Sequence, residues 1–234
     1  MSDDILLEVF VNPLQFTEVD EPWASVLNQK VTAQSILDFI CTPGISSDIE
    51  SIISRYKAIS IEKERIFAAP NEQRILDKLI WPLRNAKAGY MCGNYLGTIA
   101  LCGMVAEMVA VFLFDINKFA INKKEMSEKH QRAVFGYEFE KLGQERRVSI
   151  LYAFGVINDE IKKCFDDIRS IRRRYLHLWS HYHDNLSYDA VTCFRSAVML
   201  VVASIGQDLR EGKLVLNKKI IQYLDKHGPH VKNE

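Results

Sequence analysis

Arginine and histidine, two residue types that act together on phosphodiesters, lie close to each other near residue 175. Arg172 is followed after four intervening residues by His177, and His181 and His183 come shortly afterwards. An arginine supplies permanent positive charge and a planar set of N–H donors, and a histidine can move a proton near neutral pH. The pair therefore suits acid–base chemistry with stabilisation of charge on a phosphoryl group.

An amphipathic helix is expected to position these residues, because apolar residues upstream recur at steps of three and four. They are Ile157, Ile161, Cys164, Ile168, Ile171 and Tyr175. Arg172 lies at the edge of this apolar face, where a guanidinium needs a partner or a cleft, and Arg173 points away from it. Tyr175 lies on the face itself and is either a core residue or a base-stacking side chain beside a cleft.

Two pairings of arginine with His177 remain open. Arg172 and His177 are about 140° apart around an ideal helix, so their pairing requires the helix to loosen or end between them. Arg173 and His177 are four residues apart and share a face. A third interpretation is that the basic run is a solvated helix C-terminus, where cations suit the helix dipole.

The most apolar stretch, from Leu96 to Phe114, contains a single charge, Glu107. The stretch is long enough to span a bilayer, but a carboxylate near its middle costs about 2.5–3.5 kcal/mol there. We therefore expect a core helix and no membrane. Glu107 is either satisfied within the bundle or orients Arg172 through a charge-assisted hydrogen bond.

Three glycines at four-residue intervals, Gly89, Gly93 and Gly97, lie within the long stretch from Leu83 to Phe114. On one continuous helix they would form a smooth seam for close packing, within the bundle or across a dimer. Further helices are expected near residues 32–41 and 49–56 and from Glu72, with Pro82 as a kink. A break is expected near Gly155, with Asn158 or Asp159 as the next cap, and an apolar helix from Ser187 to Arg210. A last short helix around Ile220, Ile221 and Leu224 is expected to follow a cap at Asn217.

The composition is that of an ordinary globular protein. The chain has 234 residues, 48% of them apolar, and its 30 basic residues balance 30 acidic ones. Nothing global attracts a polyanion, so any nucleic-acid site must be a local patch. Five cysteines without a close pair, and an acidic N-terminus, predict a cytoplasmic protein.

The sequence predicts no cofactor and no metal. His181 and His183 could supply two metal ligands, but nothing at ligand spacing completes the set. Neither a phosphate-cradling loop nor a dinucleotide fingerprint is present.

Arg172-x4-His177, on a late helix of a helical chain, resembles the Arg-x(4–6)-His motif of HEPN domains. The stretch from Asn85 to Glu107 is similar to the early helix of that family, and the resemblance covers roughly residues 72–212. It implies an all-α, up-and-down helical bundle at 71–234, preceded by a mostly helical N-terminal extension at 1–70. Arg173 departs from the family, in which Asn, Asp or His commonly follows the motif arginine.

The resemblance also implies a function, which we state as an expectation. Many HEPN proteins are metal-independent endoribonucleases of toxin and defence systems, and their motif helices meet across a homodimer axis. His177 and Arg172 would be catalytic here, with Glu107, Arg173, Tyr175 and His181 in support. RNA would be the substrate, and an antitoxin or another protein could be a partner. The alternatives are a non-catalytic module that binds a protein, a nucleotide or RNA, and a helical scaffold without a site.

Overall fold

The computed structural model describes residues 49–60, 72–121, 123–178, 182–206, 208–210, 213–215 and 218–227. Helices dominate these residues, so the predicted all-α class is confirmed. Two two-stranded antiparallel hairpins are the sheet structure among them. Of the N-terminal extension, one predicted helix is described, α4 (Ile49–Ile59), and the helix expected at 32–41 lies outside the described residues.

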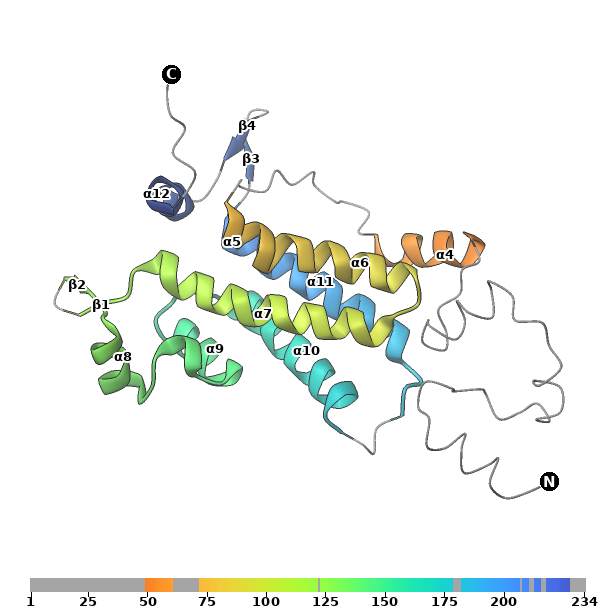
Figure 1. Cartoon of the computed structure of the whole chain (residues 1–234), viewed down its shortest axis with the longest axis horizontal. Coiled ribbons are helices and arrows are strands. Elements are labelled where there is room, and N and C mark those ends of the chain that lie inside the picture. The colour runs from red at the N-terminus through yellow and green to blue at the C-terminus, as the bar shows by residue number, and fades with distance from the viewer. Residues whose placement is uncertain are drawn as a thin grey trace, which may run out of the picture.

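Four helices form an up-and-down bundle, and Figure 1 shows how they are arranged. They are α6 (Trp81–Met91), α7 (Tyr95–Asn117), α10 (Asp159–Leu176) and α11 (Leu186–Ile205). The central helix is α7, which packs against α6, α10 and α11, while α11 also packs against α10. Burial on three sides explains why α7 is apolar nearly all round.

The expected single stretch from Leu83 to Phe114 is instead two antiparallel helices. Gly93 lies in the turn between them with φ +86°, and the Asn94 side chain caps α7 by accepting from the Gly97 N–H at 2.9 Å. The predicted glycine seam is therefore wrong, because Gly93 is not helical. Its left-handed backbone conformation is one that glycine adopts without strain. The buried Thr98 hydroxyl then ties the two helices together by donating to the Ala86 carbonyl at 3.0 Å.

Pro82 is preceded by a widened turn. The short helix α5 (Gln73–Ile75) continues into the π-helical segment η1 (Leu76–Ile80), and Pro82 lies in the first turn of α6. A proline removes one backbone donor and crowds the carbonyl four residues earlier, and a π-turn accommodates both effects. The distortion predicted at this proline is thus present, immediately before it.

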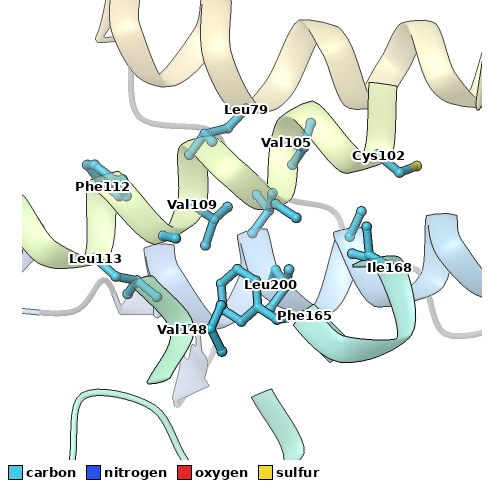
Figure 2. Close-up of a cluster of buried hydrophobic side chains, with 14 of the residues drawn as sticks. Leu79, Cys102, Val105, Val109, Phe112, Leu113, Val148, Phe165, Ile168 and Leu200 are labelled. Carbon is cyan, nitrogen blue, oxygen red and sulfur yellow. The ribbon is translucent and has the colours of Figure 1, made fainter. Parts of the chain in front are cut away.

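The core lies between α7, α10 and α11. Figure 2 shows Val109 and Leu113 of α7, Phe165 and Ile168 of α10, and Leu200 of α11 converging there. Phe165, Ile168 and Leu200 are at most 1% exposed. Burial of each such side chain contributes about 1.5–3 kcal/mol, and this packing fixes the rotation of α10 about its own axis.

The link between α7 and α10 is mostly polar. It contains the hairpin β1 (Ala120–Ile121) and β2 (Lys124–Glu125), helix α8 (Glu128–Phe135), the 3-10 turn η2 (Phe139–Lys141) and α9 (Gln144–Ala153). Gly155, at φ +66°, ends this link, and the Asn158 side chain caps α10 by accepting from the Ile161 N–H at 2.9 Å. Both the break and the cap agree with the sequence prediction.

Helix α11 ends earlier than predicted, at Gly206 with φ +65°, rather than at residue 210. Residues beyond it form the hairpin β3 (Asp208–Arg210) and β4 (Lys213–Val215). The last helix, α12 (Lys218–His227), is present as predicted and buries Ile220, and its expected cap, Asn217, lies outside the described residues.

Two helices in the described part of the chain, α7 and α11, are long and apolar enough to cross a membrane by length and composition. Core helices of soluble proteins meet the same criterion, and more than half of each apolar window is buried inside the bundle.

Candidate functional site

Arg172 lies against the backbone of α7. A Cβ atom built at Gly103 would be 2.6 Å from Cδ of Arg172, closer than a real Cβ approaches a non-bonded atom, and 3.1 Å from its Nε, which is a tight contact. The arginine stem therefore occupies the space where any other residue at position 103 would carry a side chain. The edge position that the helical wheel assigned to Arg172 places it between α10 and α7, where it remains 31% exposed.

Glu107 accepts a hydrogen bond from Nη1 of Arg172 and forms an ion pair with it. Glu107 lies four residues after Gly103, so both residues present the same face of α7 to α10. Of the two alternatives left open by the sequence, the structure thus has the one in which Glu107 bonds Arg172. Both side chains are only about two-thirds buried, so burial of Glu107 is less complete than expected.

The remaining nitrogens of Arg172 differ from Nη1. Nε is buried and has no hydrogen-bond partner. Nη2 makes no hydrogen bond within the described residues and, unlike Nε, it is not fully buried. A buried donor without a partner costs about 1–3 kcal/mol, so the stability of the fold does not by itself explain the placement of this side chain. The open Nη2 edge is where a phosphoryl oxygen could be bound.

His177 marks the end of α10. Its backbone N–H donates to the Arg173 carbonyl at 3.2 Å and its φ of −130° leaves the helical region. The side chain is exposed, and within the described residues its imidazole makes no hydrogen bond or ion pair. The helix therefore ends at the histidine, and in the described part of the chain no hydrogen bond joins the His177 imidazole to the side chain of Arg172 or Arg173.

The other arginines of α10 fall into two groups. Arg169 forms ion pairs with Glu145 and Asp166, and Nη1 of Arg174 donates to Asp189 at 2.7 Å. Arg173 is exposed and, among the described residues, has no ion pair or hydrogen bond from its side chain. Its charge is thus the uncompensated one among the arginines of this helix, and it shares a helical face with His177.

Asp189, a buried carboxylate on α11, was missed by the sequence analysis. It accepts from the Tyr175 hydroxyl at 2.6 Å as well as from Arg174, and it is 8% exposed. Burial, followed by this hydrogen bond and the charge of Asp189, raises the pKa of Tyr175. Tyr175 is therefore a buried anchor between α10 and α11. The signal that singled out Glu107, a carboxylate within an apolar helix, applies equally to Asp189.

Tyr175 also contacts the link between α10 and α11. The ring of His183 meets the Tyr175 ring edge-on, with ring centroids 5.5 Å apart. His181 lies outside the described residues, so its predicted role is not located. No three His, Cys, Asp or Glu side chains gather as a metal site would require, within the described ranges.

The structure therefore brings Arg172 and Glu107 together and places His177 one helical turn and a half away along α10. Arg173 faces solvent and Tyr175 faces α11. Comparisons with protein-family models, with curated proteins and with solved structures find no match to this chain.

Proposed function

We propose that this protein is a metal-independent endoribonuclease of the HEPN type. The observation that carries the proposal is Arg172, which is held on α7 by Glu107 with one guanidinium edge open, on the helix that ends at an exposed His177. A fixed cation and a solvent-accessible imidazole are the two groups that cleavage by internal attack of an RNA 2′-hydroxyl requires.

The chemistry assigns one task to each residue. His177 accepts the proton of the 2′-hydroxyl as its oxygen forms a bond to phosphorus. Arg172 stabilises the added negative charge on the phosphorane oxygens. The bond from phosphorus to the 5′-oxygen then breaks, and that oxygen takes up a proton from water. The products are a 2′,3′-cyclic phosphate and a free 5′-hydroxyl.

The test is cleavage of labelled RNA in the presence of EDTA. His177→Ala is expected to lower the rate by about 10²–10⁴-fold, the usual contribution of acid–base catalysis, with the circular dichroism spectrum unchanged. His130→Ala is a matched control, since His130 is an exposed histidine on α8 whose ring bonds Ser127. Equal rates for these two variants would contradict the assignment of His177.

The homodimer is part of the same proposal and rests on the resemblance, since the glycine seam that also motivated it is absent. The two motif helices would lie near a two-fold axis, so that one cleft contains both copies of Arg172 and His177. Light scattering is expected to give twice the monomer mass at micromolar concentration. A monomer that nevertheless cleaves RNA would contradict the shared cleft but not the chemistry.

A second candidate function is a non-catalytic module that binds RNA or another polyanion. Arg173 favours it, because this side chain is exposed and uncompensated while Arg172 already has a carboxylate partner. In that case wild-type protein would bind RNA with a salt-dependent affinity and release no cyclic phosphate in EDTA. Loss of binding in Arg173→Ala together with no cleavage by wild type would favour this candidate.

Toxin or defence activity, a cytoplasmic location and a cognate antitoxin belong to the proposal through the resemblance. Induced expression of the wild type is expected to arrest growth, and expression of His177→Ala is expected not to. Arrest by both would mean that toxicity is independent of RNA cleavage.

A further inference from the structure

The open edge of Arg172 is defined by residues of α7 rather than by its own helix. Gly103 leaves room for the Arg172 stem, and Glu107, one turn later, takes the hydrogen bond from Nη1. Nε faces into the protein and has no partner, so the guanidinium is confined on two of its three nitrogens. The third, Nη2, is the one left to meet a ligand.

The turn of α7 that carries Glu107 is itself fixed from a third helix. Arg147 of α9 is 8% exposed, donates through Nε to the Leu142 carbonyl at 2.7 Å, and donates through Nη1 to the Glu107 carbonyl at 3.2 Å. The backbone carbonyl of Glu107 is therefore held by α9 while its side chain holds Arg172. An anchor of this kind limits the movement of the carboxylate when the arginine acts on a substrate.

A glycine in mid-helix lowers helix stability, and here it is not needed for close approach of another backbone. Beyond neighbouring residues and the helix backbone, the three atoms that a Cβ at position 103 would meet first all belong to Arg172, at 2.6, 3.1 and 3.6 Å. The space at Gly103 thus serves the side chain of Arg172. Glu107 adds direction, since a carboxylate bonded to Nη1 sets the plane of the guanidinium.

We propose that Gly103 and Glu107 are positioning residues that orient Arg172 toward the substrate phosphodiester, an inference that rests on the proposed function. Neither residue touches the reacting atoms. Gly103 sets how deeply the arginine stem lies, and Glu107 sets which nitrogen is turned outward.

The first test measures the orientation of Arg172 without any reference to RNA cleavage. Because Nε is buried, its hydrogen is expected to exchange with solvent at least about 10-fold more slowly than in an unprotected arginine, which NMR of the Nε–H group measures. Arg172→Lys removes this signal and so assigns it. Gly103→Ala is expected to displace the stem and raise the exchange rate to that of an exposed arginine.

The matched control is Gly89→Ala. Gly89 is also helical, and a Cβ there would meet its nearest neighbours at 3.6–3.9 Å, which is ordinary contact. Gly89→Ala is expected to leave the Arg172 Nε–H exchange unchanged. Equal exchange rates in wild type and Gly103→Ala would overturn the positioning role of Gly103.

The second test separates positioning from a merely structural effect by its kinetics. Gly103→Ala is expected to lower kcat for RNA by about 10–100-fold with little change in KM, as misplacement of a catalytic group by about 1 Å does. For Glu107, the amide of Glu107→Gln can still accept from Nη1, so this variant should retain more activity than Glu107→Ala. Unchanged kcat in both Gly103→Ala and Glu107→Ala would overturn the inference.

The two tests fail in different ways. If wild type cleaves no RNA, the proposed function is wrong, while the exchange measurement still decides whether Gly103 orients Arg172. If wild type cleaves RNA and the exchange rates do not respond to Gly103→Ala, the function stands and the positioning role falls.

Discussion

Two arginine–carboxylate pairs lie two residues apart at the end of α10, and they are built differently. Arg174 donates to Asp189, which also accepts from the buried Tyr175 hydroxyl, so this carboxylate has two donors and both bonds are short, at 2.7 and 2.6 Å. Arg172 bonds Glu107 through one nitrogen, lies on a glycine, and buries a second nitrogen without a partner.

The difference separates a structural contact from a candidate functional one. Buried polar groups that stabilise a fold are usually satisfied, as Asp189 and Tyr175 are. Stability does not account for the unsatisfied Nε of Arg172, and unsatisfied groups of this kind are often found where an arrangement serves a ligand or a reaction. The Arg174 pair joins α10 to α11, whereas the Arg172 pair holds a cation at the surface.

The largest expected effect is on the proposed RNA cleavage. Arg172→Ala is expected to lower the rate by about 10²–10³-fold, since it removes stabilisation of charge in the transition state. Arg174→Ala, assayed well below its melting temperature, is expected to retain most of the activity. Rates in EDTA measure both, and a larger loss in Arg174→Ala would reverse the comparison.

Loss of stability should be larger when the Arg174–Asp189 pair is broken than when the Arg172–Glu107 pair is broken. Asp189→Ala removes the buried carboxylate that accepts from both the Tyr175 hydroxyl and Arg174, and is expected to cost about 2–3 kcal/mol in urea unfolding. Glu107→Ala removes an ion pair whose members are each about a third exposed, and is expected to cost about 0–1 kcal/mol after solvent screening. Equal losses would mean that both pairs are structural.

A smaller effect with a defined pH dependence is expected for Tyr175→Phe. Loss of the hydroxyl removes one hydrogen bond to Asp189, which is worth about 1 kcal/mol. Burial raises the pKa of Tyr175 above the ordinary 10.0, so its contribution is complete below pH 10.0 and is lost as the pH rises through the folded-state pKa.

The free energies of unfolding of wild type and Tyr175→Phe should therefore differ at pH 7 and converge in alkaline solution above pH 10. Urea unfolding at several pH values measures this difference. A gap that stays constant through that alkaline range would mean that Tyr175 does not titrate with folding.

The smallest expected effect is that of Arg173→Ala, which decides between the two arginines as partners of His177. The Arg173 side chain is exposed and makes no hydrogen bond or ion pair with another described residue, so its removal should leave stability unchanged and cleavage nearly so. Severe loss of cleavage in this variant, with Arg172→Ala mild, would assign the chemistry to the arginine that shares a helical face with His177.

The sequence alone determined the features that depend on neighbouring residues. The apolar face of α10 follows from three- and four-residue spacing, and Ile168, Ile171 and Tyr175 are buried as predicted. The cap at Asn158 and the break near Gly155 depend on local backbone and side-chain chemistry. Glu107 was a candidate site residue because a charge within an apolar helix requires a partner.

Only the tertiary structure decided which groups meet across the bundle. The partner of Glu107 is 65 residues away along the chain and the carboxylate that holds Arg174 is 15 residues away, so neither distance follows from helical periodicity. The glycines also differ between what the sequence predicted and what the packing of helices decided. Evenly spaced glycines predicted a seam, but folding places Gly93 in a turn and gives Gly103, which lies outside that spacing, the contact with Arg172. Spacing describes one helix, and the packing of helices against one another sets which of its residues must be small.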